Sequence, residues 1–361
     1  MLLNAARSNL FQNLETSGVP SGALDRLAAI GITTLAELRD HWEYGNRQLI
    51  VEYLGESPLR LVSAAPARML ATRGGAGAAP SALVNLLDAG RTRPLVKHAR
   101  GVLLSAAERA SVAVAPDAIP SVATRRAAVA ATRTVSLIAK CPPIRNQQDR
   151  GTCVAFASVG FLEFHLNATA TGAAKRFSEQ FVYWGCKNDD DMRNTEGTFV
   201  STARQVLKTR GSCLGKTWKY NPLPIPGNES QGPPPAGAKA EAKQFVFSAK
   251  AVAARKPDRL REQLDAGKPV VLSVMTFPSW DYPTTNDTGE ITMPIPGETS
   301  DGGHAICVVG YELNSRFPGG GAFIIRNSWG TAWAKPSGRF QPGYGTLFFE
   351  YIKKYGLEAY A

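Results

Sequence analysis

Long apolar runs are missing from this chain of 361 residues. No stretch reaches the roughly 18 consecutive apolar residues that a membrane-spanning helix needs, and the first residues never sustain the apolar run of a signal peptide. We therefore expect a cytoplasmic protein with no membrane partner, and leave open export by a route without a signal peptide. The composition, 44% hydrophobic and 20% charged, is typical of a globular protein with a sizeable core.

Cysteine is scarce as well, and no two cysteines form a CxxC pair. An odd number spread over a large chain argues against a disulfide framework and against a zinc-binding knuckle, so we expect free thiols, no metal and no cofactor. One pair, such as Cys186 with Cys213, could still bridge. The five cysteines are Cys141, Cys153, Cys186, Cys213 and Cys307.

The formal net charge of +11 raises the question of a nucleic-acid partner. Residues 1–56 carry a net charge of −3, residues 57–136 carry +8 and residues 137–361 carry +6. In the basic middle part the arginines are scattered among alanines, without the interleaved aromatic residues of a platform for single strands. The pattern therefore argues against nucleic-acid binding.

Residues 1–56 are predicted to form a small helical domain. Leu24, Leu27 and Ile30 have helical spacing, Gly31 ends that helix, and Thr33 or Thr34 can cap the next. The apolar and glycine pattern resembles helix-hairpin-helix modules, many of which bind DNA. Because this stretch is acidic, we favour a protein partner, and a helical cap without a binding role of its own is the alternative.

Residues 57–136 are predicted to be a linker or a pro-segment. The glycines of 74–80 interrupt the chain, helices are expected at 81–90 and 94–111, and an extended connector is expected over 115–134. A simple linker is one interpretation. A segment that covers an active site until it is removed or displaced is the other.

From residue 137 onward the residue pattern is typical of strands and turns and is richer in aromatic residues. Helical patterns come first, and apolar or alternating runs typical of an antiparallel sheet or barrel follow. This order predicts an α+β unit of two lobes over residues 137–361. The helical runs are 153–170 and 200–211, and the strand runs are 268–277, 302–312, 320–330 and 343–352.

Cys153 lies where a polar, turn-forming stretch gives way to an apolar helix. A helix N-terminus offers partial positive charge and free N–H groups, which favour the thiolate that a nucleophilic cysteine needs. We expect the thiol to stand at the exposed end of a buried helix. On this pattern alone a purely structural cysteine is favoured, because buried free cysteine is common, and a nucleophile is the alternative.

Histidine is also scarce, so the search for a base is short. His165 lies twelve residues along the same helix, roughly 18 Å from Cys153 at about 1.5 Å per residue, and His41 and His98 are expected on solvated helix faces. His304, at the start of an apolar strand, remains. Asn327 could orient its ring through one N–H, and Trp329 could cover that hydrogen bond.

The stretches NQQDRGTCVAFAS, GGHAICVVGY and RNSWGTAW followed by GYG resemble, in order, the signature blocks of papain-like cysteine peptidases. SEQFVYWGCK and EGTFVSTARQVLKTRG resemble the segments between them. The resemblance covers residues 137–361 and implies a papain-like fold with a helical lobe and a barrel-like lobe. It implies the following roles: Cys153 as nucleophile, His304 as general base and then acid, Asn327 as its orienting partner, Gln147 as oxyanion donor, Trp329 as shield, and Gly197 and Gly303 beside the substrate.

The sequence also departs from the family. Arg150 and Val154 stand where the family usually has a cysteine and a tryptophan, and the first 136 residues lack the helical pattern of cathepsin propeptides. The chain therefore looks like a bacterial-style member with its own N-terminal part. We expect a thiol endopeptidase that acts on proteins or peptides through an acyl-enzyme and is latent as a zymogen. An acyltransferase or deamidase, a toxin-like effector with a narrow substrate, and an inactive binding module are the alternatives.

Overall fold

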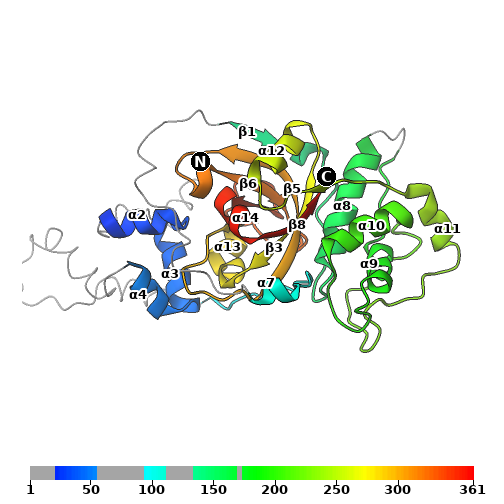
Figure 1. Ribbon diagram of the computed structural model, residues 1–361, viewed down its shortest axis with the longest axis horizontal. Helices are drawn as coiled ribbons and strands as arrows, with labels where there is room; N and C mark the ends of the chain where they lie inside the picture. The colour runs from blue at the N-terminus through cyan, green and yellow to red at the C-terminus, as the bar shows by residue number, and fades with distance from the viewer. Residues whose placement is uncertain (1–20, 55–92, 111–132, 169–172) are drawn as a thin grey trace, which may run out of the picture.

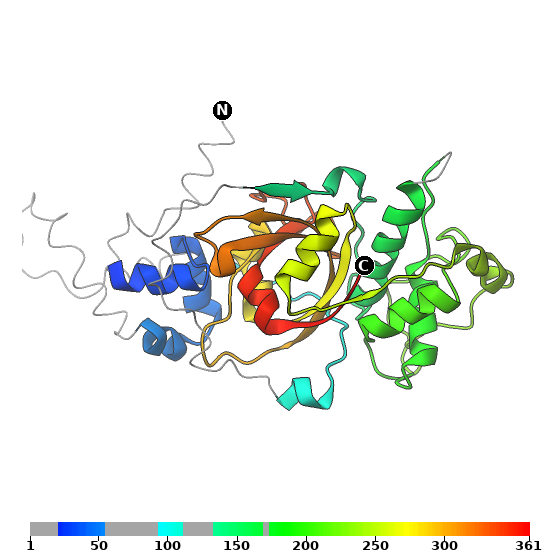
Figure 2. The same ribbon diagram turned by 45° about the horizontal axis from the view of Figure 1, so that its top comes forward.

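The computed structural model describes residues 21–54, 93–110, 133–168 and 173–361. Three bodies follow one another in Figure 1: blue N-terminal helices on the left, a sheet lobe in the centre and a green helical lobe on the right. Figure 2, turned by 45°, keeps the same order. The two lobes expected from the sequence are therefore present, and the N-terminal helices lie on the side of the sheet away from the helical lobe.

The helical lobe is built around α8 (Cys153–Ala168). This helix is apolar on every side, and each residue from Cys153 to Phe164 is buried, as expected for the central helix of a lobe. It packs against the sheet through β5 and β3. The remaining helices of this lobe are α9 (Glu179–Asp189), α10 (Val200–Thr209) and α11 (Ala238–Ala242).

The sheet lobe has the strand order β2-β8-β3-β5-β6-β7-β4, and β1 also pairs with β5. All pairings are antiparallel except that of β4 with β7, so the sheet is mixed. Every residue of β3, β6 and β7 is buried. The helices α8, α10, α12 (Pro257–Asp265) and α14 (Phe349–Tyr355) all pack on β3, and α14 also packs on β6 and β7. The strands are β1 (Thr134–Ser136), β2 (Ala251–Val252), β3 (Val270–Thr276), β4 (Glu290–Ile291), β5 (Gly302–Leu313), β6 (Gly321–Arg326), β7 (Tyr344–Phe348) and β8 (Gly356–Tyr360).

Two elements differ from the sequence expectations. The run 343–352 is a strand only as far as Phe348, after which α14 begins, and its apolar side packs on the sheet. Strand β1 begins at Thr134, the last residue of the expected connector, and pairs residue by residue with β5 from Gly310 to Glu312. Residues 115–132 of that connector, and the helix expected at 81–90, lie outside the described residues. The domain boundary after residue 136 stays a prediction.

The N-terminal helices α2 (Ser21–Ala29), α3 (Leu35–Tyr44) and α4 (Arg47–Leu54) follow their local signals. Gly31 has φ +80° and ends the first of them, and Thr34 caps α3 in a reciprocal capping box with Glu37. Their apolar faces join the core of the sheet lobe, where the Ile30 carbonyl accepts the N–H of Met293 at 2.9 Å. A protein partner for this region stays a prediction.

His41 corrects one expectation in this region. It was expected on a solvated face, but its ring is fully buried and its Nε2 lies 2.9 Å from Thr292 Oγ1. Burial lowers the pKa of His41 to about 3, so the ring is neutral in the folded protein. No helix in the described ranges is long and apolar enough to cross a bilayer.

Candidate active site

Cys153 is the first residue of α8, and its side chain faces β5. The backbone N–H of Ala305 donates to its Sγ at 3.4 Å. The thiol is completely buried, so the expectation of an exposed cysteine is wrong. Burial raises the pKa of Cys153 to about 11, although hydrogen bonds from the N–H groups of Ala305, Gly101 and Val154 act in the opposite direction.

His304 lies on β5 immediately before Ala305, and Asn327 follows β6, the next strand of the sheet. His304 Nε2 donates to Asn327 Oδ1 at 2.8 Å, and the N–H of Ser328 donates to the same oxygen at 2.8 Å. The other ring nitrogen, Nδ1, is buried without a hydrogen-bond partner among the described residues. The imidazole is thus oriented through one nitrogen, and the other is free to exchange a proton.

Trp329 covers this hydrogen bond. Its ring centroid is 4.6 Å from that of His304, and Trp280 packs edge-on against both rings. Burial lowers the pKa of His304 to about 3; the bond to Asn327 raises it, and the charges of Arg100 and His98 lower it further. In this state the imidazole is neutral.

Gln147 lies in the loop that leads into α8, and its side chain lies beside Cys153 and the residues around His304. Its Oε1 accepts from Ser328 Oγ at 2.6 Å, which fixes the amide so that Nε2 is the donor on the cleft side. Nε2 donates to the carbonyl of Arg150 at 2.9 Å and to that of Ala99 at 3.0 Å. The structure therefore brings together the five residues expected from three distant parts of the sequence.

A stretch of the chain fills the cleft above these residues, and we call residues 93–105 the cleft segment. It was expected to be helical, but only Ala106–Ala110 form a helix, α7. The cleft segment is extended because its backbone pairs with both lobes: Val102 N–H donates to Gly303 O at 3.1 Å, Leu103 N–H donates to Thr198 O at 3.1 Å, and Gly101 O accepts from Thr198 N–H at 2.9 Å. In Figure 2 it is the cyan chain that rises from α7 between the lobes.

Both glycines of the expected site touch the cleft segment. A Cβ on Gly303 would lie 2.9 Å from Val102 Cβ, and one on Gly197 would lie 2.9 Å from Gly101 O. On the helical lobe, however, the backbone hydrogen bonds to the cleft segment are made by Thr198 and not by Gly197. The N–H of Gly197 is taken by Tyr183 and its carbonyl by Lys187, so Thr198 pairs with the extended chain.

Two side chains of the cleft segment, His98 and Arg100, contact the sheet lobe. His98, expected on a solvated face, stacks on Trp329 with centroids 4.2 Å apart, and its Nε2 lies 2.7 Å from Asn286 Oδ1. Arg100 forms ion pairs with Asp281 at 2.8 Å and with Asp301 at 2.6 Å. No motif in the sequence links Arg100 to these carboxylates, so the sequence could not have revealed them.

With this geometry in place, the chain can be compared with known proteins. A sequence model described as papain family cysteine protease matches residues 131–346. The chain belongs to the papain family of cysteine proteases. The match begins just before β1 and ends inside β7, so it covers both lobes.

Two relatives bear on this assignment. An uncharacterized peptidase C1-like protein of Acanthamoeba polyphaga mimivirus is 25% identical over 230 residues, which are 60% of this chain and 68% of that protein. The crystal structure of xylellain, a cysteine protease from Xylella fastidiosa, superposes with a TM-score of 0.56 at 22% identity, over 75% of this chain and 98% of that one. The papain-like α+β fold and the activity of a thiol protease, both expected from the sequence, are confirmed.

Arg150 replaces the cysteine that this papain-family chain lacks. Its guanidinium is buried and donates to Gln180 Oε1 at 2.9 Å, to the carbonyl of Asn221 at 2.7 Å and to the carbonyl of Glu229 at 2.9 Å. It also lies over the ring of Tyr220, whose hydroxyl donates to the Gln147 carbonyl at 2.8 Å. Arg150 therefore ties the loop that carries Gln147 to the rest of the helical lobe without a disulfide, and all five cysteines are free.

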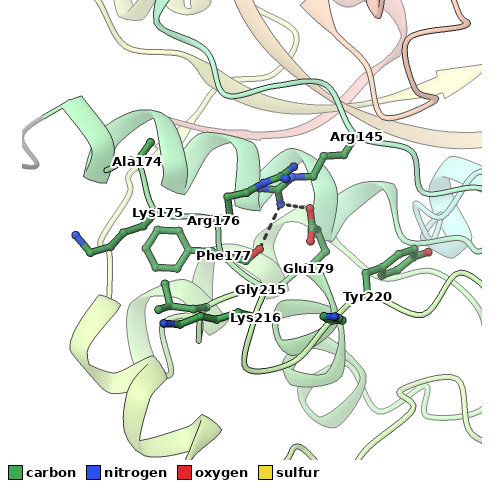
Figure 3. Close-up of a pocket in the computed structure, with 11 residues that line it drawn as sticks. Arg145, Ala174, Lys175, Arg176, Phe177, Glu179, Gly215, Lys216 and Tyr220 are labelled. Carbon is green, nitrogen blue, oxygen red and sulfur yellow. Dashed lines mark hydrogen bonds and ion pairs between the residues drawn. The ribbon is translucent and has the colours of Figure 1, made fainter. Parts of the chain in front are cut away.

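A cavity of about 530 Å³ opens in the helical lobe beside this loop (Figure 3). Arg145 donates to the Phe177 carbonyl at 3.3 Å and pairs with Glu163 and Glu179. Neither Cys153 nor His304 lines the cavity, so it is separate from the catalytic cleft. Its lining includes Arg145, Lys175, Arg176, Phe177, Lys216 and Tyr220. The described residues hold no cluster of three or more side chains suited to a metal ion.

Proposed function

We propose that this protein is a latent cysteine endopeptidase, in which Cys153 is the nucleophile and the cleft segment blocks substrate until it is displaced. The observation that carries this proposal is the position of Ala99, whose carbonyl accepts from Gln147 Nε2 above the buried Cys153 thiol. A substrate carbonyl needs that same donor. Substrate and cleft segment therefore compete for one position.

The remaining groups support a thioester mechanism. His304 Nδ1 takes the proton of the Cys153 thiol, and the sulfur attacks the carbonyl carbon of the scissile peptide. Gln147 Nε2 and the N–H of Cys153 stabilise the oxyanion, each contributing about 3 kcal/mol. His304 gives its proton to the leaving amine, and a thioester remains. Water then attacks the thioester, His304 takes its proton and returns it to the departing Cys153 sulfur, so the acid is released and the thiol is restored.

Electrostatics supports latency beyond simple blocking. The active pair is a thiolate and an imidazolium, so it needs a low pKa for Cys153 and a high pKa for His304. With the cleft segment in place, burial shifts both pKa values the wrong way, to about 11 and about 3. Displacing the segment readmits water and removes the charges of Arg100 and His98 that oppose the imidazolium.

The substitution Gly101→Ala tests the proposal in the full chain. A Cβ on Gly101 would lie 1.8 Å from the Gly151 carbonyl oxygen, so the cleft segment cannot keep its place. Overpacking of this kind costs about 1–3 kcal/mol, and we expect casein hydrolysis to rise about 10- to 100-fold over the unsubstituted chain. Gly22→Ala is the matched control, because nothing lies within 4 Å of a Cβ there, and it leaves activity unchanged.

The outcome separates the alternatives. Hydrolysis in G101A that disappears in G101A/C153A supports the endopeptidase. Hydrolysis that survives C153A contradicts the proposed nucleophile. No hydrolysis of casein in G101A, with folding intact by circular dichroism, contradicts the endopeptidase and favours an acyltransferase, a narrow-substrate effector or a binding module.

A further inference from the structure

The carboxylates of Asp281 and Asp301, which we call the acid pair, hold the guanidinium of Arg100 between them. Arg100 Nη2 is 2.8 Å from one Oδ2 and Nη1 is 2.6 Å from the other. The side chains are 12% exposed for Arg100, 8% for Asp281 and 33% for Asp301. This is a largely enclosed two-point contact, which is stronger than an exposed surface ion pair.

The backbone of the acid pair belongs to the sheet lobe, although the Asp281 carboxylate also accepts the N–H of His98 in the cleft segment at 3.3 Å. The N–H of Asp301 donates to the Thr276 carbonyl at 3.1 Å, and Thr276 Oγ1 donates to Asp301 Oδ1 at 2.9 Å. Asp281 ends the 3₁₀ turn η6 (Pro278–Asp281), and its carbonyl accepts from Asn286 Nδ2 at 3.1 Å. Displacing the cleft segment therefore leaves the Asp301 carboxylate held by Thr276 and the Asp281 backbone held by Asn286, and it frees the Asp281 carboxylate from His98 and Arg100.

Displacement also leaves the acid pair without a cation. Within the described residues, no lysine or arginine other than Arg100 forms an ion pair with either carboxylate. Two carboxylates that face one enclosed point repel each other and favour a positive charge there. Consistent with this, burial raises the pKa of Asp281 and the charge of Arg100 is the chief influence that lowers it. An open cleft therefore offers a vacant binding point for a cation.

The acid pair lies near His304, because the Arg100 guanidinium that it holds is close enough to lower the pKa of His304. Asp281 follows Trp280, whose ring packs edge-on against His304, and Asp301 lies three residues before His304. His304 is the group that protonates the leaving amine. The backbone that carries Arg100 runs past the reacting atoms, because its neighbours Ala99 and Gly101 contact Gln147 Nε2 and the Cys153 thiol.

We propose that the acid pair is a specificity site for an arginine or lysine side chain at the first residue after the scissile bond. This inference rests on the proposed function, since it concerns the same cleft once the cleft segment has left. In the latent protein Arg100 occupies the site in place of the substrate. The substrate class is therefore a peptide with a basic residue on the leaving-group side.

The test uses the full chain with Arg100→Ala and Gly101→Ala, so that Arg100 cannot compete for the site. Four fluorogenic peptides differ only in the residue after the scissile bond, which is arginine, lysine, alanine or glutamate, and mass spectrometry verifies the cleavage point. We expect kcat/KM for the arginine peptide to exceed that for the alanine peptide about 10- to 100-fold, as for a charge-assisted contact. The glutamate peptide is expected to be the poorest substrate.

Adding D281N and D301N should bring the arginine-to-alanine ratio close to one. D287N is the matched control, because Asp287 pairs with Arg93 outside the acid pair and its loss should leave the ratio unchanged. Equal rates for all four peptides, or a ratio that survives D281N/D301N, overturn the inference while the endopeptidase stands. If R100A/G101A cleaves none of the peptides, the proposed function fails and this inference fails with it.

Discussion

Two stretches of the N-terminal part, residues 21–54 and the cleft segment 93–105, look alike in sequence but fold differently. Both carry leucine and valine or isoleucine at helical spacing. The first forms three helices that join the core of the sheet lobe, and the second is extended between the lobes. The difference lies in where their backbone groups find partners: within each helix in the first case, and on Thr198 and Gly303 in the second.

The comparison assigns separate roles to the two stretches. The helices bury apolar side chains such as Leu27 and Ile30, so they contribute to stability. The cleft segment makes mostly backbone hydrogen bonds and ion pairs near Cys153 while Leu95 and Val96 remain exposed. In the proposed function it controls access to the site, whereas the helices hold the fold together.

Truncation of one apolar side chain in each stretch gives the largest expected contrast. Leu27→Ala removes a side chain that is 1% exposed and should lower the free energy of unfolding by about 2–5 kcal/mol. Val96→Ala removes one that is 53% exposed and should change it by less than about 0.5 kcal/mol. Urea unfolding of both variants measures the difference, and equal values would contradict the separation of roles.

A smaller contrast uses the same capping motif in both stretches. Thr34 Oγ1 accepts from Glu37 N–H at 3.2 Å before the ten-residue α3, and Ser105 Oγ accepts from Glu108 N–H at 3.2 Å before the five-residue α7. Thr34→Ala should cost about 1 kcal/mol. Ser105→Ala should cost less than about 0.5 kcal/mol, because α7 is short and largely exposed. Thermal unfolding should rank T34A below S105A; the opposite order would contradict the comparison.

The sequence alone predicts the long buried elements of the fold and the candidate residues of scarce types. The apolar run of α8 and the strands β5 and β6 could be found from their patterns, and the scarcity of histidine singled out His304. The catalytic roles of the residues placed around Cys153 stay predictions until they are tested by substitution.

The cleft could not be predicted in the same way, because its occupant is set by distant partners. The apolar residues of 94–105 have helical spacing, and no local sequence pattern predicts that their backbone pairs with Thr198 and Gly303. For the same reason the sequence did not reveal the burial of Cys153, the stacking of His98 on Trp329, or the carboxylates of Asp281 and Asp301 around Arg100.

The central claim is that the cleft segment keeps Cys153 protonated and covered. Alkylation of Cys153 by iodoacetamide, followed by mass spectrometry from pH 5 to pH 11, tests it most directly in the full chain and in G101A. Because burial raises the pKa of Cys153 to about 11 and lowers that of His304 to about 3, the full chain should react slowly at pH 7 and faster only as the pH rises toward 11. G101A should react at least about tenfold faster at pH 7, since its thiolate and imidazolium can form there. Identical pH profiles for the two proteins would contradict the account.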